Sequence, residues 1–163
     1  MIIVIIGPMG CGKTTVGELL ADRMGWVFAD ADDYHPEENV EKMRQGIALE
    51  DADRLGWLRS LRSHMDEQIK QGQDLVLACS ALKQSYRDLL GIDQKRVVSV
   101  YLKGSAELLR KRITSRTHQY MNESLLQSQL QTMEEPEDGL TVSIDQTPEM
   151  ICSEIIKELS ITS

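Results

Sequence analysis

The stretch MIIVIIGPMGCGKTT, residues 1–15, decides the fold of this chain. Residues 1–6 are all apolar, which predicts a strand buried on both faces, as in a parallel sheet. The segment from Gly7 to Thr14 fits G-x-x-x-x-G-K-[ST] at every fixed position, and a helix with apolar residues at helical spacing is expected over residues 13–24. A strand, a glycine-rich turn and a helix in this order predict a phosphate-binding loop.

The chemistry of this loop follows from its residue types. Glycines allow the backbone to curl until successive N–H groups converge on phosphate oxygens, and the positive end of the following helix points at the same place. We expect Lys13 to bridge the β- and γ-phosphates of a nucleoside triphosphate, and the Thr14 hydroxyl to ligate Mg²⁺. The residues predicted to contact the nucleotide here are Gly7, Gly10, Cys11, Gly12, Lys13, Thr14 and Thr15.

The remaining segments alternate between strands and helices. Strands are predicted over residues 26–29, 75–79, 97–102 and 140–144, and helices over 36–45, from Asp51 or Asp53 to about 71, over 85–90, 105–115 and 123–133, and from Pro148 onward, with Thr147 as its cap. This alternation predicts a single α/β domain over residues 1–163. Its three layers would comprise a central parallel sheet of about five strands with helices on both faces, and ligands would bind at the carboxyl ends of the strands.

Composition narrows the classes of partner. The net charge of −8 argues against nucleic acid, and a longest apolar run of six residues is too short to span a bilayer. Three scattered cysteines and the absence of a signal-peptide pattern predict a reduced, cytoplasmic protein. The segment from Lys83 to Arg116 contains nine basic and three acidic residues, and this local positive charge suits a small anionic ligand. Solvated helix faces are the better explanation for most of these basic residues.

Two carboxylates follow the second predicted strand. Asp30 and Asp32 are two residues apart, so they project to the same side of an extended chain. Near a γ-phosphate, one carboxylate can hold the water shell of the metal and the other can orient an attacking hydroxyl. We expect Asp30 near the metal and Asp32 near the hydroxyl. Solvated acids that cap the next helix are the alternative.

Five separated motifs carry a resemblance to a known family. They are DADDYHP at residues 30–36, NVEKM at 39–43 with GIAL at 46–49, DADRLGWL at 51–58, ACSALK at 78–83 with YRD at 86–88, and Leu125-Leu126, Ser128-Gln129, Glu134 and Pro136. In this order they resemble the gluconokinase family over nearly the whole chain. The resemblance implies phosphorylation of the 6-hydroxyl of D-gluconate, with ATP and Mg²⁺, to 6-phospho-D-gluconate, a reaction that feeds sugar-acid catabolism.

A pocket for gluconate needs hydrogen-bonding groups for hydroxyls and a fixed cation for the carboxylate. Asp32, His35, Lys83 and Arg87 are the predicted substrate-binding residues. Arg87 is the first choice for the carboxylate, because its planar fork can bind two oxygens at once. Trp57 is either a pocket wall or a core residue.

A basic helix precedes a short polar stretch, and we expect a lid over residues 116–124. An arginine brought over the transferring phosphoryl group would stabilise its spreading charge, and Arg116 is favoured for this catalytic role. Arg112 is the second choice and is expected near the nucleotide. Against the family's R-x-G-H-F-M pattern, His118 falls on the Gly and Gln119 on the His, so any role of the family's lid His is in doubt here.

Other classes of protein share parts of this pattern. Shikimate kinase has the same fold and a D-x-D pair, but it would place a Gly-Gly-Gly turn where this chain has Cys79-Ser80-Ala81. Nucleoside monophosphate kinases share the fold alone. A nucleotide-sensing adaptor would keep the loop without any need for the D-x-D pair. The sequence leaves open whether the protein is a monomer or a homodimer.

Overall fold

The computed structural model describes residues 1–114 and 123–160. Its centre is a five-stranded sheet in the order β2-β3-β1-β4-β5, in which every neighbouring pair is parallel. The strands are β1 (Ile2–Ile6), β2 (Val27–Asp30), β3 (Leu75–Ala78), β4 (Val97–Lys103) and β5 (Leu140–Ser143). The helices are α1 (Lys13–Met24), η1 (Ala31–Tyr34, a 3₁₀ turn), α2 (Glu37–Arg44), α3 (Asp51–Lys70), α4 (Gln84–Leu90), α5 (Ala106–Thr114), α6 (Glu123–Thr132) and α7 (Pro148–Glu158). The predicted α/β architecture with five parallel strands is confirmed.

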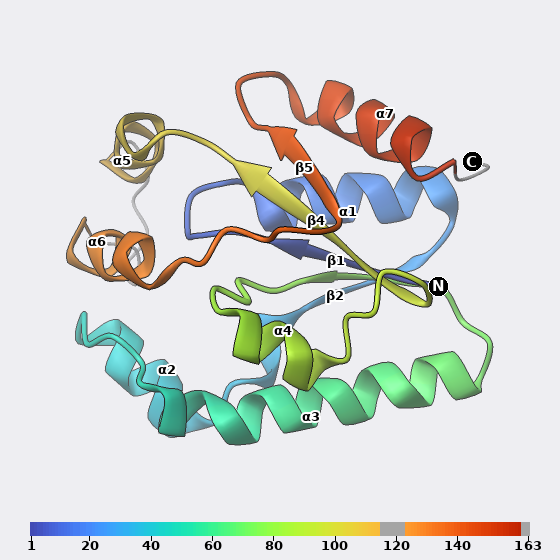
Figure 1. Ribbon diagram of the computed structural model, residues 1–163. Coiled ribbons are helices and arrows are strands. Elements are labelled where there is room, and N and C mark those ends of the chain that lie inside the picture. Colours follow the sequence, from blue (N-terminus) through green and yellow to red (C-terminus); the bar gives the residue numbers. More distant parts are fainter. Residues whose placement is uncertain (115–122, 161–163) are drawn as a thin grey trace.

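The first strand is buried on both faces, as its unbroken apolar run predicts. Alternate residues of β1 enter two separate cores: Ile3 and Ile5 pack with α1 and α7, whereas Ile2, Val4 and Ile6 pack with α3 and α4. Figure 1 shows these two helix pairs on opposite faces of the sheet. This double burial makes β1 a firm base for the loop that leaves its end.

Local polar contacts set the beginnings of three helical segments. The Thr147 hydroxyl accepts from the Met150 N–H at 3.2 Å, so the predicted cap of α7 is confirmed. At the start of α3, the Asp53 carboxylate accepts from the Glu50 N–H at 2.9 Å. The chain from Asp30 to Asp32, expected to be extended, turns into η1 instead, because the Asp30 carboxylate accepts from the Asp32 N–H at 2.9 Å and tightens the turn.

All five strands end at the same edge of the sheet because they are parallel. At this edge the phosphate loop follows β1, the acidic segment follows β2, and the Cys79-Ser80-Ala81 turn follows β3. Helices α2, α5 and α6 gather at the same end of the molecule (Figure 1). None of the helices in the described part of the chain is long and apolar enough to cross a membrane.

Candidate active site

The phosphate loop has the backbone shape that its glycines predict. Gly10 and Gly12 have φ angles of 83° and 95°, in the left-handed region where a side chain would be strained. Gly12 caps α1, which therefore begins at Lys13. The Lys13 ammonium donates to the Pro8 carbonyl at 3.1 Å, so it lies folded over the loop. The loop thus directs the start of a helix and a fixed cation toward the same space.

The two residues predicted to hold Mg²⁺ lie together. The Thr14 hydroxyl donates to Asp30 Oδ2 at 2.9 Å, although the two residues belong to different segments. Both line the same cavity. Their oxygens are the hard ligands that Mg²⁺ prefers, and a phosphate oxygen of a bound nucleotide could complete the set. These residues therefore fit the ion.

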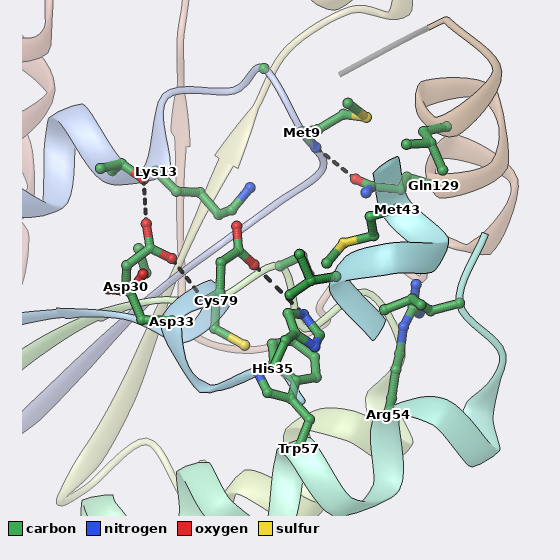
Figure 2. Close-up of a pocket in the computed structure, with 18 of the residues that line it drawn as sticks. Met9, Lys13, Asp30, Asp33, His35, Met43, Arg54, Trp57, Cys79 and Gln129 are labelled. Atoms are coloured by element: carbon green, nitrogen blue, oxygen red, sulfur yellow. Dashed lines mark hydrogen bonds and ion pairs between the residues drawn. The ribbon is translucent and has the colours of Figure 1, made fainter. Parts of the chain in front are cut away.

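A cavity of about 610 Å³ opens beside the loop. Figure 2 shows Lys13 and Asp30 at one side of it, Arg54 at the other, and His35 with Trp57 between them. The volume is in the range of small-molecule sites. The polar residues that line it include Lys13, Thr14, Thr15, Asp30, Asp32, Asp33, His35, Arg54, Ser80, Ser128 and Gln129.

The side of this cavity away from the loop is built around a stacked pair of rings. The His35 and Trp57 rings lie 3.9 Å apart at an angle of 18°, and the Trp57 indole N–H donates to the Ala31 carbonyl at 2.7 Å. Burial and, to a smaller extent, the nearby Arg54 charge lower the His35 pKa to about 4, and Asp30 opposes this shift. His35 is therefore neutral at neutral pH. Trp57 is both a core residue and a cavity wall.

Asp32 lies beside the His35 ring, on the wall of the cavity. Its side chain is 75% exposed, and Oδ1 lies 3.8 Å from His35 Nε2. It lines the same cavity as Lys13. The predicted pair of a loop lysine and a D-x-D carboxylate therefore faces one space.

Arg54 is a cavity residue that the sequence analysis did not select. Its guanidinium donates to the Tyr86 hydroxyl at 3.1 Å and lies 5.2 Å from the centre of the Tyr86 ring. The Tyr86 hydroxyl in turn donates to Asp51. A signal was present in the sequence, because Arg54 precedes Trp57 by three residues and so shares its face of α3.

Arg87, the residue first expected to bind a carboxylate, lies outside this cavity. It is only 2% exposed, and it donates to the backbone carbonyls of Ala81, at 2.9 Å, Leu82, at 3.0 Å, and Glu134. Desolvation lowers its pKa. The guanidinium ties the turn after β3 to the segment after α6, which favours a structural role for Arg87 over the expected substrate contact.

Lys83 is also directed elsewhere. Its ammonium binds the Asp51 carboxylate at 3.0 Å, and this hydrogen bond raises the Lys83 pKa. Lys83 does not line the 610 Å³ cavity. This ion pair holds the start of α3, which favours a structural role for Lys83 over the expected substrate contact.

Arg112 approaches the phosphate loop from α5. It donates to the carbonyls of Gly10, at 3.3 Å, and Cys11, at 3.4 Å, and to that of Ile144 at 3.2 Å. A smaller cavity of about 200 Å³ lies against this side of the loop and is lined by Cys11, Gly12, Thr15, Val16, Arg112, Gln146, Pro148 and Ile151. Arg112 is thus beside the loop, as expected. Arg116, His118 and Gln119 lie outside the described residues.

Helix α6 also contacts the loop. The Met9 N–H donates to the Gln129 side-chain oxygen at 2.7 Å, and Figure 2 shows this contact at the upper edge of the cavity. Gln129 belongs to a motif that the sequence analysis singled out without a role. The contact joins the segment that follows the expected lid to the phosphate loop.

A phosphate loop, a pair of oxygen ligands and an acceptor cavity in one parallel α/β sheet define a P-loop kinase of small molecules. The sequence model of the shikimate kinase family matches residues 9–160. The chain belongs to the gluconokinases, within the wider class of kinases that this family model describes.

Individual relatives support this placement. The chain is 42% identical to a gluconokinase of Gluconobacter oxydans over 158 residues, which cover 95% of this chain and 89% of that one. It is 36% identical to a gluconokinase of Arabidopsis thaliana over 171 residues, which cover 96% and 90%. A solved gluconokinase from Sinorhizobium meliloti superposes with a TM-score of 0.83 at 38% identity, covering 97% of this chain and 90% of that one.

Proposed function

We propose that this chain transfers the γ-phosphoryl group of ATP to the 6-hydroxyl of D-gluconate, giving 6-phospho-D-gluconate and ADP. The observation that carries the proposal is the single cavity that joins Lys13 to Asp32, His35 and Arg54. It offers a phosphate site, a carboxylate, a neutral imidazole and a distant cation in one space. The gluconokinase names of the relatives support the same substrate.

The reacting end of the substrate would lie next to Asp32. As the 6-hydroxyl oxygen bonds to the γ-phosphorus and the bond to the ADP oxygen breaks, the Asp32 carboxylate accepts the hydroxyl proton. Lys13 stabilises the charge on the β- and γ-phosphates. Thr14 and, through water, Asp30 would hold Mg²⁺, which neutralises phosphate charge when bound.

The carboxylate of gluconate is at the opposite end of its carbon chain from the 6-hydroxyl, so the cation that binds it must lie away from the phosphate loop. Arg54 meets this condition, because it lines the cavity on the side opposite Lys13 (Figure 2). Its planar fork can hold two carboxylate oxygens, and the bond to Tyr86 fixes its direction. Arg54 therefore replaces Arg87 as the carboxylate ligand.

The predicted lid would complete the nucleotide side. We expect Arg116 to reach the transferring phosphoryl group and Arg112 to remain beside the loop, with the nucleotide base in the smaller cavity that Arg112 lines. Hydrogen exchange over residues 116–124 tests the lid: protection should rise when an ATP analogue and gluconate are both present. Equal protection with and without them, together with a harmless Arg116→Ala, would contradict it.

The cellular setting follows from the same activity. We expect a cytoplasmic enzyme of sugar-acid catabolism, built as one domain over residues 1–163, without nucleic-acid or membrane partners. The choice between a monomer and a homodimer stays open, and sedimentation of the purified protein decides it.

One assay tests the function directly. ATP consumption coupled to ADP detection should depend on D-gluconate and Mg²⁺, and the product should be phosphorylated at the 6-position. Other aldonates, shikimate and nucleoside monophosphates serve as competing substrates. Turnover of shikimate or of a nucleoside monophosphate, with none of gluconate, would overturn the assignment.

A further inference from the structure

Behind the His35 ring lies a buried polar side chain with no role in the proposed chemistry. Asn39, on α2, is 3% exposed. Its amide nitrogen donates to the Asp53 carbonyl at 2.8 Å and lies 3.2 Å from His35 Nδ1. One buried amide therefore joins His35, which follows η1, to the first turn of α3.

The Asp53 carbonyl fixes the orientation of this amide. A backbone carbonyl can only accept a hydrogen bond, so the nitrogen of Asn39, and not its oxygen, must face Asp53. The second N–H of the same nitrogen then points at His35 Nδ1, which must accept it. A neutral imidazole carries a single proton, and burial lowers the His35 pKa to about 4. The proton of the neutral ring is therefore on Nε2.

The other side of the ring faces the reacting carboxylate. His35 Nε2 lies 3.8 Å from Asp32 Oδ1, and the stack on Trp57 at 3.9 Å fixes the plane of the imidazole. We propose that Asn39 is a positioning residue that holds His35 as the Nε2–H tautomer, so that the ring presents a hydrogen-bond donor to Asp32 and to the substrate oxygen beside it. The inference rests on the proposed role of Asp32 as the base for gluconate.

The direction of this donor matters for the chemistry. At 3.8 Å the contact is longer than a hydrogen bond, but a neutral N–H on this side of the ring places a positive dipole near Asp32 without cancelling its charge. An unprotonated Nε2 would instead face the carboxylate with a lone pair, which favours a protonated Asp32 that cannot accept the hydroxyl proton. The Asp53–Asn39–His35 chain therefore sets which ring nitrogen offers a donor beside the base.

The tautomer can be read in the free protein. Long-range ¹H–¹⁵N correlation spectra of the three histidines at pH 7.5 report which ring nitrogens carry a proton, and the loss of one pattern in His35→Gln identifies His35. We expect an unprotonated Nδ1 and a protonated Nε2. A protonated Nδ1, or signals averaged between the two tautomers, would overturn the inference. Because no substrate is used, this result is independent of whether gluconate is the acceptor.

Substitutions separate tautomer control from simple packing. In Asn39→Asp the new carboxylate accepts from Nδ1, so we expect Nδ1 to become protonated. We expect kcat/KM for gluconate to fall about tenfold, the scale of one lost hydrogen bond, with KM for ATP unchanged. Ser99→Ala is the control. Ser99 is also buried, and its hydroxyl accepts a hydrogen bond from the Gln94 amide, but it does not line the cavity. An unprotonated Nδ1 or unchanged gluconate kinetics in Asn39→Asp would contradict the role.

A second pair of variants does not depend on how Asn39→Asp folds. The amide nitrogen of Gln can occupy the place of the imidazole Nε2, whereas that of Asn corresponds to Nδ1. If the donor at Nε2 is what the site requires, His35→Gln retains at least fivefold more kcat/KM for gluconate than His35→Asn. Equal activities, or a more active His35→Asn, would overturn the inference.

Discussion

The two sides of the cavity are built in different ways. On the nucleotide side, the loop between β1 and α1 supplies backbone N–H groups, and the first turn of α1 supplies Lys13 and the Thr14 hydroxyl. On the acceptor side, side chains from η1, α3 and the segments between them converge, and distant partners hold two of them: Tyr86 contacts Arg54, and Trp57 stacks on His35. Backbone recognition can therefore be read from a single motif, whereas side-chain recognition depends on which residues the fold leaves facing the cavity.

The largest effect should come from the nucleotide side. In Lys13→Ala the charge on the β- and γ-phosphates loses its nearest fixed cation, so we expect kcat to fall about a thousandfold or more. In the described part of the chain Lys13 forms hydrogen bonds only to Pro8 and Cys11, so the melting temperature should hardly change. Steady-state kinetics and thermal unfolding measure both, with the exposed Lys95→Ala as control. Near-normal turnover in a folded Lys13→Ala would refute the loop assignment.

The next largest effect tests the base on the acceptor side. Asp32→Asn keeps the shape of the side chain but removes its ability to take the hydroxyl proton, so kcat should fall about a hundredfold to a thousandfold. Binding of an ATP analogue should be unaffected. Asp66→Asn makes the same chemical change on an exposed part of α3 and should leave kcat within about twofold. A comparable loss in both variants would mean that charge, and not position, is responsible.

The two arginines provide the sharpest test of how the acceptor side is built. Arg54→Lys retains charge but loses the planar fork, so KM for gluconate should rise about tenfold to a hundredfold, while KM for ATP and the melting temperature stay near the wild-type values.

Arg87→Lys should show the opposite signature. It loses buried hydrogen bonds to three carbonyls, which should lower the free energy of unfolding by about 2–3 kcal/mol and leave KM for gluconate nearly unchanged. Chemical denaturation and kinetics on both variants make the comparison. A gluconate-specific KM defect in Arg87→Lys would restore the substrate role first expected for Arg87.

These two arginines also mark the limit of what the sequence predicts. The five strands, the loop and the meeting of Thr14 with Asp30 follow from apolar runs and from the rule that parallel strands end at one edge. Both arginines lie in motifs that resemble the gluconokinases, so the motifs alone did not rank them. Arg87 does not line the cavity, because its guanidinium donates a hydrogen bond to the carbonyl of Glu134, which lies 47 residues further along the chain. Such a contact belongs to the packing of α6 and leaves no local pattern.

The smallest expected effect concerns His35, whose neutral state also depends on distant partners. In the unfolded chain its pKa is near 6.5, whereas burial lowers it to about 4 in the folded protein; the charged groups that face the ring are Asp32, Asp30 and Arg54. Below pH 6.5 the unfolded state therefore binds a proton that the folded state does not, so the contribution of His35 to stability is fully present above about pH 6.5 and is lost as the pH falls toward 4.

We expect the free energy of unfolding of the wild type to fall by about 2 kcal/mol more than that of His35→Gln between pH 7 and pH 4.5. The difference between the two slopes is the readout, because removing the ring also changes the packing against Trp57 by an amount that does not vary with pH. His64→Gln serves as the control, because it removes a histidine that packs against Tyr34 instead of Trp57. Parallel pH profiles for the wild type and His35→Gln would mean that folding does not lower the His35 pKa. The acceptor side would then present a cation beside Asp32 as soon as the pH falls below about 6.5, and its neutral character would no longer be a product of the fold.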